Sequence, residues 1–213
     1  MTLEKKGLFF VFEGIDGAGT STHVHRLAER IEQHNKYQDV LKTHEPWKSA
    51  EIKKRLEEDS DAYSNAYEMA DLYVDDRAKH SYRLIRPNLE AGVVVICSRY
   101  KMSTCAYQWV QGMDLHELLQ MHKERGIITP DLTFFLDVPP EIAQERIASR
   151  KAKEKFEDIE FAKRLVDSYN ALRALSKFDE RIFGKVVRID GNREVEEVSD
   201  DIFEEFLSVY QQK

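Results

Sequence analysis

A glycine-rich segment that joins an apolar run to a helical pattern constrains this chain more than any other feature. The segment, Phe9–Thr22, has the sequence FFVFEGIDGAGTST, and the overlapping run Leu8–Phe12 is apolar throughout, as a buried strand is. After the segment, apolar side chains recur at helical spacing, at Val24, Leu27, Ala28 and Ile31. The chain therefore starts with a strand, a glycine loop and a helix.

This order predicts a phosphate-binding loop. Gly14, Gly17 and Gly19 let successive backbone N–H groups converge on an anion, and the helix N-terminus adds a partial positive charge. The segment matches the pattern G-x-x-x-x-G-K-[ST] except at Thr20, where the pattern has lysine. A glycine-rich turn without a ligand is the alternative, and the strand and helix on either side favour phosphate binding.

Four further strand-like runs follow, with helical patterns between them, at Val40–Thr43, Val93–Cys97, Leu132–Leu136 and Val186–Ile189. Short runs rich in Val, Ile and Phe are typical of parallel strands that are covered on both faces. We therefore predict a single α/β domain over residues 1–213, of the P-loop NTPase type. Its open parallel β-sheet has about five strands, with helices on both faces in three layers, and ligands bind at the carboxyl ends of the strands.

Composition and charge exclude several classes of function. The 213 residues carry a net charge of −7, which argues against a protein that coats nucleic acid. No apolar stretch reaches membrane-spanning length, and the N-terminal residues lack the apolar core of a signal peptide. Cys97 and Cys105 show no metal-binding spacing, which indicates a reducing compartment. We expect a cytoplasmic protein with small-molecule partners and no nucleic acid or membrane partner.

Two further groups of residues are candidates for ligand binding. Tyr73 and Arg77 are four residues apart in the long helical segment Tyr63–Gly92, so both project from one face. Core packing plus a surface charge is the simpler explanation of that pair. Between Arg146 and Lys155 lie five basic residues in an otherwise acidic chain. They predict either a solvated helix face or a lid, at about residues 146–158, that closes over a polyphosphate.

Four segments, in their order along the chain, resemble the thymidylate kinases, P-loop enzymes that phosphorylate dTMP. FEGIDGAG resembles the phosphate loop of that family, and THEP at Thr43–Pro46 its second-strand motif, usually Arg-Glu-Pro. SRYKMSTCAYQ at Ser98–Gln108 is similar to its Asp-Arg-Tyr motif, and PDLTFFLDVPPEIAQERIASR at Pro130–Arg150 to its fourth strand and the approach to its lid. The resemblance implies ATP-dependent phosphorylation of dTMP to dTDP, with ATP as co-substrate, Mg²⁺, and a homodimer formed through long helices.

The resemblance also implies roles for the matching residues in substrate binding. Arg99 would grip the dTMP phosphate, Tyr73 would stack on thymine, and Arg77 would hold the base or the phosphate end. Asp16 would face the 3′-hydroxyl, and Tyr107 would exclude a ribose 2′-hydroxyl. The full set is Asp16, His44, Pro46, Tyr73, Arg77, Arg99, Ser103, Thr104, Tyr107 and Gln108.

On the ATP side, the resemblance implies that the loop backbone holds the phosphates and that Ser21 ligates Mg²⁺. The ATP-binding set is Gly14, Ile15, Asp16, Gly17, Ala18, Gly19, Thr20, Ser21, Thr22, Arg146 and Arg193. The catalytic set consists of Arg99 and the lid cations Arg150, Lys151, Lys153 and Lys155.

Three departures from the family pattern fall on charged positions. Thr20 replaces the loop lysine, His44 replaces the arginine before Glu-Pro, and Ser98 replaces the aspartate before Arg99. Each lost hydrogen bond to a charged group costs about 1.5–3 kcal/mol, or roughly one to two decades of rate if it acts in the transition state.

We predict that a lid cation takes over the contact of the missing lysine, and that Asp137 or Glu13 helps to order the metal. Two other functions stay open at this point. One is a deoxynucleoside monophosphate kinase of broader base preference, and the other is a nucleotide-binding homologue with impaired catalysis.

Overall fold

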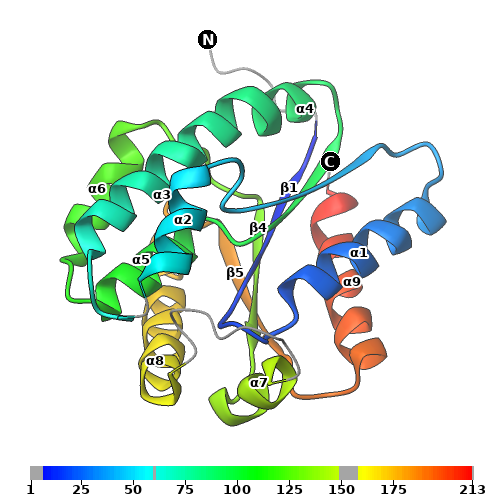
Figure 1. Cartoon of the computed structure of the whole chain (residues 1–213). Helices are drawn as coiled ribbons and strands as arrows, with labels where there is room; N and C mark the ends of the chain where they lie inside the picture. The colour runs from blue at the N-terminus through cyan, green and yellow to red at the C-terminus, as the bar shows by residue number, and fades with distance from the viewer. Residues whose placement is uncertain (1–6, 60, 149–157, 213) are drawn as a thin grey trace.

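A parallel five-stranded sheet lies at the centre of the computed structural model, which describes residues 7–59, 61–148 and 158–212 (Figure 1). Across the sheet the strands follow the order β2-β3-β1-β4-β5, and every neighbouring pair is parallel. Their bounds are Phe9–Glu13 for β1, Val40–His44 for β2, Val94–Ser98 for β3, Leu132–Asp137 for β4 and Lys185–Asp190 for β5. All five predicted strands are confirmed, with ends that shift by about one residue.

Helices cover both faces of the sheet, which confirms the predicted three-layer α/β/α fold (Figure 1). On one face, α1 (Thr20–His34) packs beside α9 (Val195–Tyr210). The other face carries α3 (Ala66–His80), α5 (Lys101–Val110), α6 (Leu115–Glu124) and α8 (Ile159–Ser176). The shorter helix α2 (Ala50–Glu58) packs on α3, and α7 (Pro140–Ile147) packs on α8 near the carboxyl ends of the strands.

The inner strands supply the core, whereas the edge strands are less buried. Every residue of β1 and β3 is buried, whereas all of β2 and all of β5 except Ile189 are partly buried or exposed. Aromatic rings bridge the inner strands and the helices: Phe12 stacks on Phe134 at 4.8 Å, and Phe10 lies 5.1 Å from Phe206. The expectation that all five strands are covered on both faces is thus correct only for the inner strands.

The long helical segment predicted at Tyr63–Gly92 is a helix with a change of winding near its end. After α3 comes a π-helical stretch, η1 (Ser81–Ile85), and then α4 (Arg86–Glu90). Pro87 lies in the first turn of α4, where its missing N–H costs little. Gly92 has φ +90° just past the helix end, as the predicted C-cap requires.

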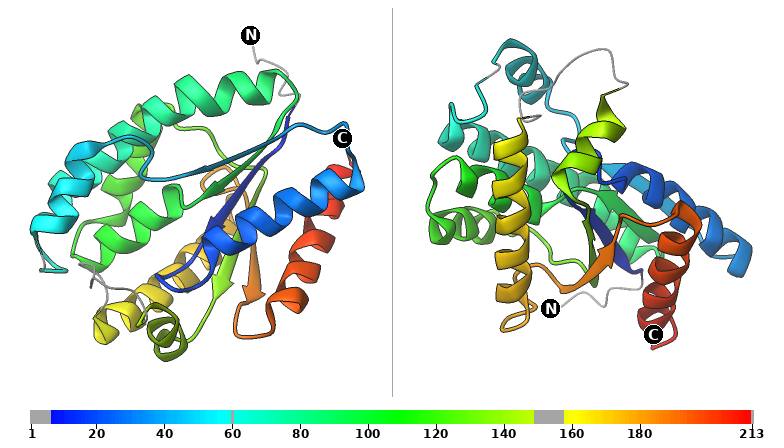
Figure 2. Two further views of the ribbon diagram at one scale, coloured as in Figure 1. Left: turned by 45° about the vertical axis from the view of Figure 1, so that its right-hand side comes forward. Right: turned by 90° about the horizontal axis from the view of Figure 1, so that it is seen from below.

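All five strands point their carboxyl ends toward one edge of the molecule, which Figure 2 shows from below in its right-hand view. The glycine loop, the start of α1, α7 and the turn before α9 meet at this edge. In the part of the chain that the structure describes, no helix is both long and apolar enough to span a membrane.

Candidate active site

The glycine loop joins β1 to α1 and has the geometry of a phosphate cradle. Gly17 has φ +85°, and a Cβ atom there would lie 2.3 Å from the carbonyl oxygen of Ala143 on α7. Only glycine fits this position, because both the backbone conformation and the close approach of α7 exclude a side chain. No side chain within the described residues caps the N-terminus of α1 by a hydrogen bond, which leaves first-turn N–H groups available to an anion.

The side chains of the loop divide into two groups. Ile15 and Ala18 are buried in the core, so only their backbone atoms can contact a ligand. Ser21 and Thr22 are exposed on the first turn of α1. An exposed hydroxyl at this point is suited to a metal–phosphate complex, since Mg²⁺ takes few protein oxygens and keeps phosphate and water ligands.

Two of the three departures from the family pattern contact each other. The Ser98 hydroxyl, at the end of β3, donates a hydrogen bond of 3.0 Å to Thr20 Oγ1, and both side chains are buried. The family pattern has aspartate and lysine at these positions, so a neutral hydroxyl pair stands where two opposite charges would stand. The exchange keeps the charge balance, and it leaves neither hydroxyl without a partner.

The third departure, His44, lies beside this pair. It ends β2 directly opposite Ser98 in the strand register, and its side chain is exposed. The three departures therefore converge on one corner of the site, although Thr20 and Ser98 are 78 residues apart in the sequence. The strand order β2-β3-β1 brings them together.

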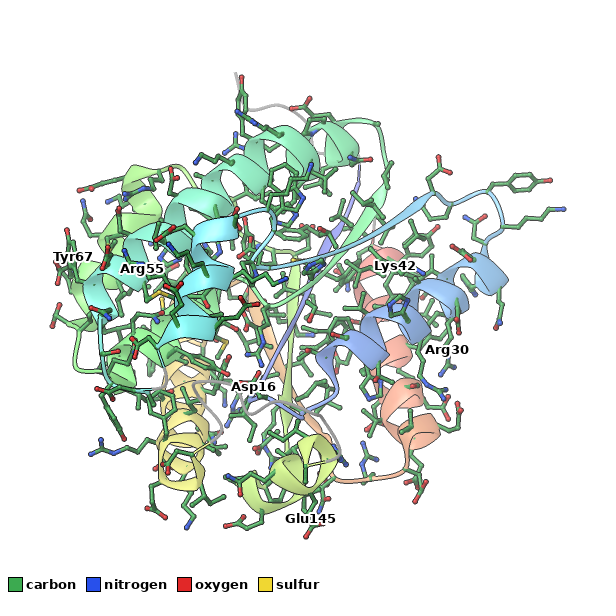
Figure 3. All side chains as sticks on the ribbon, viewed as in Figure 1. Asp16, Arg30, Lys42, Arg55, Tyr67 and Glu145 are labelled. Atoms are coloured by element: carbon green, nitrogen blue, oxygen red, sulfur yellow. The ribbon has the colours of Figure 1, made fainter. Side chains whose placement is uncertain are left out.

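A cavity of about 210 Å³, the acceptor cavity, opens next to the glycine loop. Most of its lining was predicted as substrate-binding from the sequence. Its lining residues are Asp16, Glu45, Pro46, Leu56, Tyr73, Arg77, Arg99, Ser103, Thr104, Tyr107 and Gln108. His44 is the predicted substrate residue that is not among them. Figure 3 places Asp16 just past the carboxyl end of β1, between α1 and the helices of the opposite face.

Arg77 is a buried wall of this cavity, with 1% of its surface exposed. Its Nε donates to Glu45 Oε2 at 2.6 Å. Its two terminal nitrogens donate to His122 Nε2 at 2.7 Å and to Thr104 Oγ1 at 3.0 Å. The simpler explanation from the sequence, a surface charge, is therefore wrong: three partners hold this guanidinium in one orientation.

The partners of Arg77 are themselves held in place. His122 Nδ1 lies 2.7 Å from the carbonyl oxygen of Leu118 and donates to it, so Nε2 is the acceptor for Arg77. Burial, and next the charge of Arg77, lower the pKa of His122 well below its usual range, which keeps the ring neutral. Glu45 also accepts a hydrogen bond of 3.0 Å from His80 Nδ1.

Arg99 lies at the entrance, between the glycine loop and α5, and has φ +65°. Its guanidinium binds Asp16 Oδ1 at 2.5 Å and the Gly14 carbonyl oxygen at 2.7 Å. Asp16 also accepts a hydrogen bond of 3.3 Å from the Tyr107 hydroxyl. A left-handed backbone is unusual for a non-glycine residue, and here it directs the arginine toward the loop and the cavity.

Glu13 supports the site from beneath. Its carboxylate is fully buried and accepts from the backbone N–H groups of Tyr100, at 2.9 Å, and Ser103, at 3.2 Å, and from the Ser103 hydroxyl. Burial raises the pKa of Glu13, against the hydrogen bond from Ser103 and the charge of Arg99, which lower it. The expectation that Glu13 helps to order a metal is wrong, because this carboxylate is enclosed and committed to the start of α5.

Asp137, the alternative metal residue, is paired with Arg188, whose Nε lies 2.6 Å from Oδ2. Arg146 donates a hydrogen bond of 3.0 Å to the carbonyl oxygen of Gly191, which links the end of α7 to the turn before α9. Arg193 pairs with Asp201 on α9. The predicted lid cations Arg150, Lys151, Lys153 and Lys155 lie outside the described residues.

Two lining residues were missed in the predicted set. Glu45 belongs to the THEP motif and directly follows β2, so its place at a strand end was a usable signal. Leu56 on α2 carries no such signal, because an apolar side chain on a helix usually faces the core.

Comparison with known proteins shows similarity to one enzyme family along most of the chain. A family model for thymidylate kinase matches residues 12–202. A probable thymidylate kinase of Thermococcus kodakarensis is 40% identical over 172 residues, which are 76% of this chain and 82% of that protein. A thymidylate kinase of Ruegeria pomeroyi is 38% identical over 210 residues, 95% of each chain.

Proposed function

The chain belongs to the thymidylate kinase family, and on that premise we propose that it transfers the γ-phosphoryl group of ATP to dTMP. The products are dTDP and ADP. The acceptor cavity binds dTMP, and the glycine loop binds the phosphates of ATP. The observation that supports this best is a cavity lined by both the arginine fork of Arg99 and the side chain of Gln108, whose buried amide oxygen has no partner among the described residues.

The orientation of that amide follows from its neighbours. Gln111 Nε2 donates to the carbonyl oxygens of Ala62, at 2.7 Å, and Ser64, at 3.3 Å, so Gln111 Oε1 must be an acceptor. Gln108 Nε2 donates to that oxygen at 3.0 Å. Gln108 Oε1 is therefore left as a buried acceptor without a protein partner among the described residues.

A buried acceptor without a partner costs free energy until a ligand donor pairs with it. Thymine offers a ring N–H between two carbonyl groups, so its edge donates to such an acceptor. Cytosine offers an unprotonated ring nitrogen at the same place, which would repel Gln108 Oε1. The acceptor cavity should therefore take dTMP and dUMP and discriminate against dCMP.

Phosphoryl transfer depends on positioning and on charge neutralisation more than on covalent chemistry by the protein. Arg99 exchanges Asp16 for the dTMP phosphate, which an arginine fork binds bidentately. A phosphate oxygen of dTMP then forms a bond to the γ-phosphorus as the bond to the β,γ-bridging oxygen breaks, and ADP leaves with that electron pair. Backbone N–H groups of the glycine loop stabilise the charge on the transferring group.

Mg²⁺ is the implied metal, and Ser21 is its protein ligand in this proposal. When bound, the ion neutralises phosphate charge. The exposed hydroxyl of Ser21 fits an ion that is otherwise held by phosphates and water.

The cation that serves the transferring phosphate in place of the loop lysine is assigned, from the sequence, to the lid of this single kinase domain. Replacing Lys151, Lys153 and Lys155 together by alanine should abolish turnover. Replacing the exposed lysines Lys53 and Lys79, which lie on α2 and α3, is the matched control. Near-normal turnover in the triple variant would show that another group neutralises the charge.

A cytoplasmic homodimer completes the proposal. The exposed aromatic side chains Tyr67, on α3, and Tyr82, in η1, offer apolar surface along the long helix for a second copy. Light scattering coupled to size-exclusion chromatography measures the mass directly. A monomer at micromolar concentration would exclude a stable dimer.

A substrate panel tests the function as a whole. ADP release is followed with ATP and dTMP, dUMP, dCMP or dGMP, and dTMP is expected to have the highest kcat/KM. Comparable rates with all four would support a kinase of broader base preference. No ADP release with any of them, together with saturable dTMP binding by calorimetry, would identify a nucleotide-binding protein without turnover.

A further inference from the structure

A second cavity, of about 460 Å³, lies behind the acceptor cavity and takes no part in the proposed reaction. We refer to it as the rear cavity. Lys101 and Cys105 line it from one face of α5, whereas Ser103, Thr104, Tyr107 and Gln108 line the acceptor cavity from another face. The polar residues of the rear cavity are Lys101, His122, Lys123, Thr129, Asp179 and Arg181.

Lys101 is the unusual residue in this cavity. It is 7% exposed, and within the described residues Thr129 Oγ1, at 3.2 Å, is the acceptor that its Nζ contacts. Thr129 in turn donates to the carbonyl oxygen of Arg181 at 2.7 Å, which fixes its lone pair toward the lysine. An ammonium group has three donors and no acceptor, so a buried lysine with one partner has donors left for a ligand.

The charges around Lys101 do not neutralise it. Asp179 is the acidic residue of the lining, and it is bound through both oxygens to Arg181, at 2.8 Å each. His122 is neutral, because its ring nitrogens bind Leu118 and Arg77. Among the described residues, neither Lys101 nor Lys123 forms an ion pair, so the lining keeps two uncompensated positive charges in a chain of net charge −7.

The electrostatics of the neighbouring groups agree with this geometry. Burial lowers the pKa of Lys101 to about 8; the nearby Cys105 acts to raise it, and the charge of Arg77 to lower it further. Burial and then the charges of Arg77, Lys101 and Arg125 depress the pKa of His122, as expected where the local potential is positive. The attraction between an anion in the rear cavity and the Lys101 ammonium group would offset the free-energy cost of burying that charge.

We propose that the rear cavity binds a small molecule that carries an oxyanion, a phosphate or a carboxylate. Lys101 is its charged ligand, Thr129 orients Lys101, and Lys123 adds charge. The lining also includes the apolar side chains of Leu119, Ile127 and Phe183, which accommodate the non-polar part of the same molecule. The shared chemistry of the two oxyanions is a compact negative group that accepts several hydrogen bonds.

Calorimetric titration of inorganic phosphate and, separately, of acetate tests this site. The protein is first saturated with dTMP, Mg²⁺ and a non-hydrolysable ATP analogue, so that the phosphate-binding groups of the proposed reaction are occupied. Wild-type protein should show one saturable site for at least one of the two anions, and the preferred anion identifies the oxyanion class. Absence of saturable binding for both would overturn the proposal.

Lys101→Met is the decisive variant, since it keeps the length of the side chain and removes the charge. It should weaken anion binding by about tenfold or more, the scale of one hydrogen bond to a charged group. Lys53→Met, on the exposed face of α2, is the matched control and should bind as wild type does. Equal anion affinity in Lys101→Met and wild type would overturn the proposal.

Lys123→Gln, a change at an exposed residue, keeps the test decisive if Lys101→Met does not fold. It should weaken binding by about threefold to tenfold, because it removes one of the two uncompensated charges. Unchanged affinity in Lys123→Gln would then count against the site. Lys101 and Lys123 do not line the acceptor cavity, so the difference in anion affinity between these variants and wild type does not depend on the result of the substrate panel.

Discussion

The acceptor cavity and the glycine loop lie next to each other and are built in opposite ways. In the wall of the acceptor cavity, the charged groups of Glu45 and Arg77 are buried and each has more than one partner. Arg77 is held by Glu45, His122 and Thr104. Around the glycine loop, the buried side chains Thr20 and Ser98 are neutral, and the proposed anion site consists of backbone N–H groups. The first region is specified by side chains and the second mainly by backbone geometry.

This difference explains how the chain can depart from its family at charged positions. A buried charge needs a complementary partner, and a change at one residue of a network leaves another residue unpaired. Thr20 and Ser98 avoid that cost because they change together and bind each other. In the acceptor cavity, a change at Arg77 would leave three partners unpaired at once. The pocket residues there resemble the family pattern, at Tyr73, Arg77, Arg99, Ser103 and Tyr107.

The largest effect is expected from Arg99→Met. Loss of the fork leaves the dTMP phosphate without its charged ligand and should lower kcat/KM for dTMP by about a hundredfold or more. Arg99→Lys keeps the charge without the fork and should recover part of the loss. Arg55→Met, at an exposed ion pair between α2 and α3, is the control and should retain activity. A loss of less than about fivefold would contradict the role of Arg99.

The second prediction concerns the buried network around Arg77 in the wall of the acceptor cavity. Glu45→Gln removes the carboxylate that holds both Arg77 and His80, and leaves a buried guanidinium without its counter-charge. The free energy of unfolding should fall by about 3–5 kcal/mol, measured by urea denaturation, and KM for dTMP should rise. Glu51→Gln, at an exposed pair with Arg55, should leave stability nearly unchanged. Equal stability of the two variants would show that Arg77 does not need its network.

The third prediction tests the neutral pair by a double-mutant cycle of Thr20→Lys and Ser98→Asp. Each single change places one charge beside a hydroxyl, whereas the double change places opposite charges together. Each change in kcat/KM for ATP is converted to a free energy. The effect of the double change should then be more favourable than the sum of the two single effects by about 1–3 kcal/mol. Additivity within about 0.5 kcal/mol would mean that the two positions do not act as a pair. If Thr20→Lys alone raises turnover about tenfold, no other cation had fully replaced the lysine.

The smallest effect is expected at His44. Its exposed side chain lies at the end of β2 outside the acceptor cavity, so His44→Ala should change KM for dTMP by less than about twofold. Michaelis constants for dTMP and ATP are measured side by side. An increase of about fivefold for dTMP would restore the sequence-based prediction that His44 contacts the substrate.

Local patterns predicted the sheet, and the resemblance to the thymidylate kinases predicted most of the residues that line the acceptor cavity. Apolar runs of strand length located the inner strands β1, β3 and β4, because a strand buried on both faces is apolar throughout. The edge strands β2 and β5 were located by shorter runs rich in Val, Leu and Ile. The rule that ligands bind at the carboxyl ends of parallel strands placed Asp16, Pro46 and Arg99 near one another. The positions of Tyr73 and Arg77 on one helix face were also readable, because helical spacing is local.

The partners of those residues were decided by tertiary structure alone. Nothing near Thr20 in the sequence indicates Ser98, which is 78 residues away and meets it only because β3 pairs with β1. The enclosure of Glu13 and the link from Arg77 to His122 likewise depend on how α5 and α6 pack on the sheet. The fold class and the position of the glycine loop, with Thr20 where the family pattern has lysine, could be read from the sequence. Burial and long-range pairing, which no local pattern encodes, decided that the missing charge is matched by a second neutral residue.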